Sequence, residues 1–323
     1  MSVLGAPLAA LAWLGRQGTR AIAALVFIGL ALPPVDALLK PFVTEAIFGL
    51  LVIAFVRVDP AALRGYLGRP RLVLAATAWT MLVLPTLYGV GGLLLGLDAL
   101  APDLFLALVL QAVASPMMAA PAFAAAMGLD AALVLAALVT SSILTPITAP
   151  LFAYAFVGAA LTLSPLTLGF KLLAILAGSV VVAVVIRRLA GAAALARYRQ
   201  EIDGFNILVV FVFVAAVMEN VVARFLAAPL LMLGLGILAF ALSFAVLGLT
   251  ALVFARAGRD RAFVLGLMAS QRNMGLMLAA TGGAIPDLAW IWFALCQFPI
   301  YLTPQLLKPL ALTLSPSGRG KRA

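Results

Sequence analysis

Long apolar stretches follow one another along almost the whole chain. Each is about long enough to cross the roughly 30 Å of hydrocarbon in a bilayer. The 40 residues from Ala131 to Phe170 carry no charge, and we divide them at the loop-like segment 161–165. The pattern predicts an all-α integral membrane protein with ten transmembrane helices: 21–39, 42–58, 72–97, 104–128, 131–157, 165–186, 204–222, 227–255, 262–284 and 287–307.

Basic residues fall between these stretches and indicate the topology. With the N-terminus inside and the sides alternating, only Lys40, Lys171 and Arg224 fall outside, whereas seventeen basic residues fall inside. Because positive charge marks cytoplasmic loops, both termini are predicted to be cytoplasmic in a multi-pass protein of the inner (plasma) membrane. The inside set is Arg16, Arg20, Arg57, Arg64, Arg69, Arg71, Arg187, Arg188, Arg197, Arg199, Arg256, Arg259, Arg261, Lys308, Arg319, Lys321 and Arg322.

The first and last residues are expected to lie outside the bundle. Arg16 and Arg20 before an apolar run are also typical of a signal peptide, but the run continues to Asp36 without a clear cleavage site. We therefore interpret residues 1–20 as an N-terminal interfacial segment. The rest divides into a first five-helix repeat (21–160), a second (161–310) and a cytoplasmic tail (311–323) expected to be disordered.

Two halves of five helices indicate an internal duplication. A polar linker around Arg187 to Asp203 separates them, and an odd number of spans per unit requires the second copy to be inverted. Residues 114–128 and 269–283, which are 155 positions apart, agree at five of fifteen positions. The agreeing pairs are Ala114/Ala269, Ser115/Ser270, Ala124/Ala279, Ala125/Ala280 and Gly128/Gly283.

Both segments contain residues that interrupt a membrane helix. Pro116 and Pro121 each remove a backbone donor, so helix 4 is expected to break there. Helix 9 holds four polar residues in succession, 270–273, flanked by glycines. Since lipid cannot satisfy freed backbone groups, we predict that broken helices 4 and 9 cross inside the protein at a functional site. The alternative is a polar clamp that only holds helices together.

Composition excludes several classes of protein. Hydrophobic residues make up 66% of the chain and charged residues 10%, there is no histidine, and Cys296 is the single cysteine. We therefore expect no enzyme, no cofactor and no metal site, and the scattered basic groups form no nucleic-acid surface. An ATP-driven pump is disfavoured because the chain has no phosphate-binding Gly-x-x-x-x-Gly-Lys-Ser/Thr sequence.

The Ser-Pro start of helix 4 and the segment Gln271-Arg-Asn-Met-Gly-Leu276 resemble the bile acid:sodium symporter family. The resemblance implies ten spans in two inverted five-helix repeats, with broken fourth and ninth helices that cross. It also implies a panel of helices moving against a core bundle, and organic anions carried by alternating access. The lipid bilayer and a small organic anion are then the expected partners.

Aligned with that family, the chain lacks the residues that bind sodium. Met268 takes the place of a sodium-coordinating Glu, and Arg272 takes the place of a coordinating Gln. The family's Ser-Asn pair of helix 4 falls near Pro121 and Ala122, and the hydroxyl ligands of helix 5 fall near Val134 and Leu138. Because sodium needs several oxygen ligands, we expect transport that is not coupled to sodium.

Other polar residues complete the predicted site. Asp36, Glu45 and Glu219 lie near helix ends, where a carboxylate usually faces headgroups. An unpaired arginine is costly in a membrane, so Arg272 should meet a carboxylate, helix-end carbonyls or the anionic substrate, and Glu219 is our preferred counter-ion. Gln111, Thr140, Ser141, Ser142, Thr145 and Gln297 lie within spans, and hydroxyls there usually bond back to their own helix. The predicted substrate contacts are Arg272, Asn273, Ser270, Gln271, Ser115 and Gln297.

The function predicted from the sequence is secondary transport of a small organic anion without sodium coupling. Two alternatives remain open: a non-transporting receptor or scaffold of transporter descent, and a conventional sodium-coupled symporter.

Overall fold

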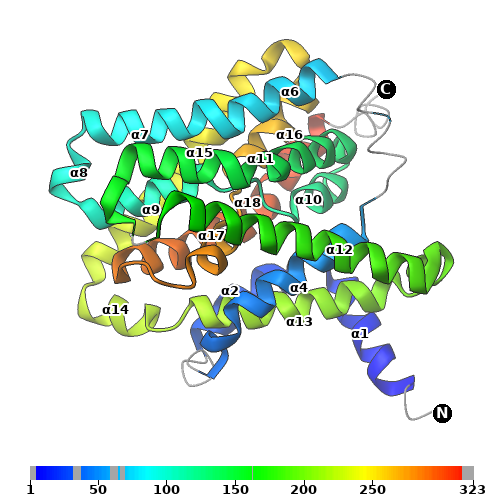
Figure 1. Cartoon of the computed structure of the whole chain (residues 1–323). Helices are drawn as coiled ribbons and strands as arrows, with labels where there is room; N and C mark the ends of the chain where they lie inside the picture. Colours follow the sequence, from blue (N-terminus) through cyan, green and yellow to red (C-terminus); the bar gives the residue numbers. More distant parts are fainter. Residues whose placement is uncertain (1–4, 32–37, 59–64, 66–69, 162, 315–323) are drawn as a thin grey trace. The chain divides into compact units, whose positions relative to one another are not determined.

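The computed structural model describes residues 5–31, 38–58, 65, 70–161 and 163–314 (Figure 1). Within these ranges the chain forms helices and no strand. Five helical stretches are long and apolar enough to cross a bilayer, as expected for an all-α membrane protein. They are Pro70–Leu94, Ala131–Val157, Pro165–Arg197, Arg199–Ala227 and Pro229–Val253.

Packing divides the chain into two units, and each takes residues from both halves of the sequence. The first comprises Met1–Arg57 and Ile175–Pro229, and the second comprises Val58–Ala174 and Leu230–Ala323. Helices of the first are α1 (Gly5–Gln17), α2 (Thr19–Ala31), η1 (Lys40–Phe42), α4 (Val43–Val56), most of α12 (Pro165–Arg197), α13 (Arg199–Val217) and α14 (Val221–Ala227). Helices of the second are α6 (Pro70–Ala78), the π-helical η2 (Trp79–Val83), α7 (Leu84–Leu94), α8 (Leu97–Leu100), α9 (Pro102–Val113), α10 (Ala120–Ala126), α11 (Ala131–Val157), η3 (Gly158–Ala160), α15 (Pro229–Val253), η4 (Ala255–Ala257), α16 (Arg259–Ser270), α17 (Met274–Thr281) and α18 (Asp287–Leu314).

In the first unit, α4 and α13 run antiparallel and are joined near both ends. Lys40 Nζ, just before α4, lies 2.5 Å from Glu219 Oε2, just after α13. Arg57 Nη2, after α4, lies 2.5 Å from Asp203 Oδ1 in the first turns of α13. These two ion pairs fix the register of the helices with respect to one another.

Glycines let α1 approach the backbone of α13. A Cβ on Gly204 of α13 would overlap the backbone of Leu11, and one on Gly15 of α1 would overlap the carbonyl oxygen of Gln200. Small residues at a helix interface permit this distance, which is common in membrane proteins. The predicted interfacial segment therefore contains a helix that packs closely on this unit.

In the second unit, α11 packs against α6, α7, α9 and α10, and α9 also packs against α18. Fully buried Trp292, Phe293 and Phe123 belong to its core. Trp79 Nε1 donates to Thr250 Oγ1 at 2.9 Å, which connects η2 with α15. The resulting bundle holds both of the interrupted helices predicted from the sequence.

Several predicted boundaries agree with the structure. Helix α11 ends at Val157 and α12 begins at Pro165, as the division of the uncharged tract required. Two boundaries differ. Helix α18 continues to Leu314, so residues 311–314 of the predicted tail are helical, while 315–323 lie outside the described residues, as does Asp36.

The segment predicted as a polar linker, between Arg187 and Asp203, is almost entirely helical, so the helix extends beyond the span end predicted at residue 186. Helix α12 continues to Arg197, with a kink at Gly191 (φ 76°), and α13 begins at Arg199. The alanines of residues 189–196 explain the difference, since alanine has the highest helix propensity.

Candidate functional site

Two helices of the second unit are interrupted where the sequence predicted. Helix α9 ends at Val113 and α10 begins at Ala120, while α16 ends at Ser270 and α17 begins at Met274. Pro116 lies within the first interruption and has no N–H for the carbonyl four residues earlier. The predicted break at Pro121 was wrong. Pro121 lies in the first turn of α10, where the N–H that proline lacks would have no helical partner in any case.

The two interruptions pair with each other as short antiparallel segments. Met117 N donates to Gln271 O at 2.8 Å, and Asn273 N donates to Ser115 O at 2.8 Å, around the pair Pro116 and Arg272. Backbone groups that leave a helix inside a bundle need such partners. The predicted meeting of the two interrupted helices is therefore confirmed at the level of individual hydrogen bonds.

Arg272 lies at this pairing and is almost completely buried, with 4% of its surface exposed. Its Nη1 donates to Ala114 O at 3.1 Å, directly after the end of α9, and its Nη2 donates to Thr80 O at 2.8 Å. Among the described residues it has no carboxylate partner. The guanidinium therefore binds backbone carbonyls, and it also places a positive charge at the negative C-terminal end of the α9 dipole.

A proline makes the Thr80 carbonyl available. In η2 the hydrogen bonds connect residues five apart, and Leu84 N–H donates to Trp79 O. The next donor in that series would belong to residue 85, which is proline and has no N–H. Thr80 O is thus left without a helical donor and accepts from Arg272 instead. Pro85 was the sequence signal for this partner, and it was missed.

Gln271 uses a second carbonyl freed by a proline. Its Nε2 donates to Ile300 O in α18 at 3.2 Å, and the usual helical donor to that carbonyl would be residue 304, which is proline. The side chain is fully buried, and its Oε1 has no hydrogen-bond partner among the described residues. Gln271 and Arg272 therefore attach the second interruption to α18 and to η2 respectively.

The other predicted substrate contacts make local bonds. Ser270 Oγ donates to Leu267 O, Gln297 Nε2 donates to Phe293 O, and Asn273 Oδ1 accepts from Leu276 N as the N-cap of α17. Ser115 is fully buried, and its Oγ has no hydrogen-bond partner among the described residues. Asn273 is the member of this set that keeps partial exposure. The site thus gathers all the predicted residues of helices 4 and 9.

Glu219 has a partner other than the predicted one. It pairs with Lys40 in the first unit, whereas Arg272 in the second unit donates to carbonyls. Among the partners expected for Arg272, the structure shows helix-end carbonyls, such as that of Ala114 after α9, and the preferred counter-ion Glu219 was wrong.

One buried polar side chain of α9 accepts a hydrogen bond from a donor far along the sequence. Gln111 Oε1 accepts from Trp292 Nε1 at 2.8 Å, so α9 and α18 are also joined by this bond. Thr140 and Thr145 donate to carbonyls of their own helix, as expected of hydroxyls within a span.

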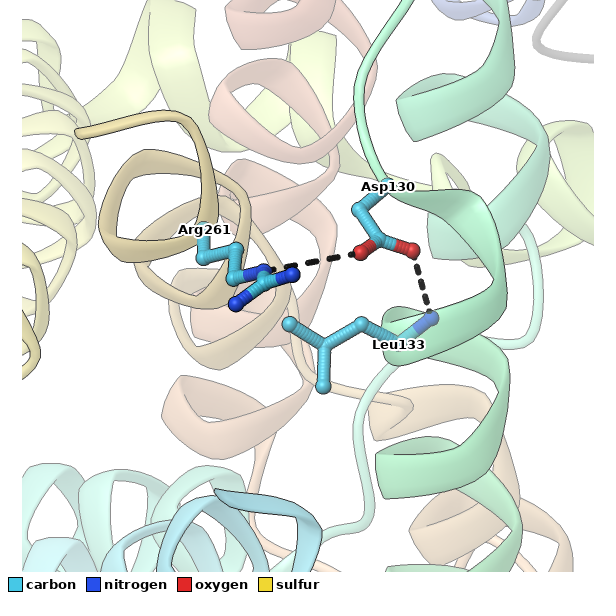
Figure 2. A network of polar contacts seen from close by, with 3 residues as sticks. All are labelled: Asp130, Leu133 and Arg261. Carbon is cyan, nitrogen blue, oxygen red and sulfur yellow. Dashed lines mark hydrogen bonds and ion pairs between the residues drawn. The ribbon is translucent and has the colours of Figure 1, made fainter. Parts of the chain in front are cut away.

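Asp130 caps the start of α11, the helix that follows α10, and it provides a test of local stability. Its Oδ1 accepts from Leu133 N at 3.0 Å as the N-cap of α11, and its Oδ2 lies 3.9 Å from Arg261 Nε (Figure 2). Asp130→Ala should lower the free energy of unfolding by about 1 kcal/mol, because the cap is lost. Asp130→Asn should stay near wild type, since Asn caps equally well and a partly exposed ion pair contributes little. Thermal melting of the purified variants checks both; an Asn variant as unstable as the Ala variant would assign the effect to the ion pair.

Comparison of the sequence with protein-family models and with curated proteins gives no match.

Proposed function

We propose that the protein is a secondary transporter that moves a small organic anion across the membrane by alternating access, without sodium coupling. The observation that carries the proposal is the pairing of two interrupted helices around a buried arginine. Interrupted helices inside a membrane bundle are typical of transporters, because irregular backbone is tolerated only where protein or a watery cavity surrounds it.

The order of the helices supports two inverted five-helix repeats and ten spans. Helix α11 begins at Ala131 and α18 at Asp287, while α4 begins at Val43 and α13 at Arg199, so both pairs have the same spacing of 156 residues. Gly128 and Gly283 have left-handed φ angles of 69° and 72° at equivalent positions after α10 and α17. Spacings that agree to within one residue for helices, interruptions and left-handed glycines are expected of a duplicated unit.

The pairing of the interruptions supports inversion as well. Antiparallel segments are related by a local two-fold axis. The central pair, Pro116 and Arg272, is 156 residues apart, which equals the spacing of the helices. An axis through this pair would therefore exchange the two repeats.

The division into two units supports alternating access. Each unit combines a stretch from the first half of the chain with a stretch from the second half. That is the arrangement expected if a panel made from both repeats moves against a core made from both repeats.

The guanidinium of Arg272 supports both the anionic substrate and the independence from sodium. It binds two carbonyl oxygens in a buried place, as a metal cation would, and its charge is permanent. A permanent positive charge in a low-dielectric bundle attracts an anion. We propose that Arg272 provides this attraction, while Asn273 and Ser115 offer polar contacts beside it.

The test is uptake by proteoliposomes. Organic anions are first screened for thermal stabilisation of the purified protein, because a ligand that binds the native state raises its apparent stability. Uptake of an anion found in this way should be the same when sodium is replaced by potassium. Loss of uptake in potassium would favour a conventional symporter, and stabilisation without uptake would favour a receptor or scaffold.

A further inference from the structure

One end of the first unit carries seven arginines against two carboxylates. The carboxylates are Glu201 and Asp203, at the start of α13. The arginines belong to four helices and to the residue after α4: Arg16, Arg20, Arg57, Arg187, Arg188, Arg197 and Arg199. We call this set the arginine end.

Three contacts bring these arginines together. Arg16 Nη1 donates to Gln200 Oε1 at 3.3 Å, directly beside Arg199. Arg57 pairs with Asp203 one turn farther along α13. Arg187 Nη1 donates to Val56 O at 2.5 Å, beside Arg57. The C-terminal part of α12, the end of α4 and the ends of α1 and α13 therefore meet at one place.

Most of this positive charge is not neutralised within the described structure. The side chains of Arg16, Arg20, Arg188, Arg197 and Arg199 belong to exposed residues and form no ion pair with a described carboxylate. Asp203 is engaged by Arg57, and Glu201 is half-buried, with no hydrogen-bond partner for Oε2. Five of the seven arginines of the arginine end thus have no carboxylate partner among the described residues.

The surface next to the arginine end is apolar. On α12, Val181, Val185 and Leu189 are 61%, 48% and 83% exposed, and Trp13 on α1 is 57% exposed. Exposed aliphatic side chains beside arginines, together with an exposed tryptophan, are expected where the hydrocarbon of a bilayer meets its headgroups. A soluble acidic partner would not require the aliphatic part of this surface.

We propose that the arginine end binds the phosphate groups of anionic phospholipids. Guanidinium groups donate two parallel hydrogen bonds to a phosphate, and several of them together select a charged headgroup over a zwitterionic one. This inference requires only that the protein lies in a membrane and is independent of transport.

The experiment measures lipid preference in nanodiscs that contain equal amounts of phosphatidylglycerol and phosphatidylcholine. Native mass spectrometry counts the lipids that remain bound after release from the nanodisc. The wild type should retain phosphatidylglycerol preferentially, and Arg188→Gln/Arg197→Gln/Arg199→Gln should lower that preference at least about tenfold.

A matched control removes the same charge from the second unit, with Arg256→Gln/Arg259→Gln/Lys308→Gln. This control should keep the preference, and an equal loss in both triple variants would overturn the proposal in favour of a net-charge effect.

Inorganic phosphate should not displace the bound phosphatidylglycerol; displacement would show a site for soluble phosphate. If the first triple variant does not fold, the single variants Arg197→Gln and Arg199→Gln must each lower the preference. If the wild type shows the lipid preference but no uptake, the proposed transport is contradicted and the proposed lipid binding stands.

Discussion

Arg272→Gln should weaken binding of the proposed anionic substrate about 10- to 100-fold and reduce uptake accordingly. The substitution removes a permanent charge from a buried place and leaves the carbonyls of Ala114 and Thr80 without their donors. Hydrogen bonds to a charged group contribute about 1.5–3 kcal/mol, which corresponds to that range of binding constants. Anion binding is measured by calorimetry, and uptake is measured in proteoliposomes.

Two further variants separate charge from shape at this position. Arg272→Lys keeps the charge as a compact ammonium on a flexible stem and should retain part of the anion binding. Arg272→Ala leaves space between the two carbonyls, so millimolar guanidinium ion in the assay should restore part of the uptake. Restoration by guanidinium would show that a cation is needed at this place.

The control is Arg256→Gln, which removes an exposed arginine from η4 in the same unit. It should leave binding and uptake near wild type. If Arg272→Gln binds the anion as well as wild type does, Arg272 holds the two interruptions together and takes no part in recognition.

Regular features of the second unit could be predicted from the sequence, because they depend on local chemistry. Pro116 removes a donor wherever it lies in a membrane helix, and the polar run that ends at Asn273 supplies an N-cap for a new helix. The ends of α11 and the start of α12 follow from the same local reasoning. These features need no knowledge of distant residues.

The partners of the polar side chains could not be predicted, because they come from distant parts of the chain. Arg272 binds the carbonyl of Thr80, which is 192 residues away, and that carbonyl is available because the π-helical geometry of η2 is combined with Pro85. Glu219 was expected to serve Arg272, yet Lys40 lies beside it once α4 and α13 pack antiparallel. In both cases tertiary packing selects the partner after the sequence has supplied the charge.

The second large effect is expected from Pro85→Ala, which changes no charge. Alanine at this position supplies an N–H that donates either to Met81 O as in an α-helix or to Thr80 O as in a π-helix. In the α-helical case Leu84 N–H shifts to Thr80 O, and in the π-helical case the new N–H donates to Thr80 O directly. In both cases a backbone donor competes with Arg272 for the Thr80 carbonyl. We expect uptake to fall about tenfold, as for the loss of one hydrogen bond to a charged group. Uptake and thermal melting are measured on the same preparations.

The expected change in melting temperature distinguishes this prediction from a loss of uptake caused by unfolding. Replacing a proline inside a helix by alanine usually stabilises the helix, because alanine is about 3 kcal/mol more favourable there. Pro85→Ala is therefore expected to keep or raise the melting temperature while uptake falls. The control is Pro309→Ala at an exposed position of α18, which restores an N–H in the same way and should leave uptake unchanged.

In a double-mutant cycle, Pro85→Ala should add little to Arg272→Gln, because both remove the same contact. Fully additive losses would show that Pro85 acts on uptake by a route other than the bond between Thr80 and Arg272.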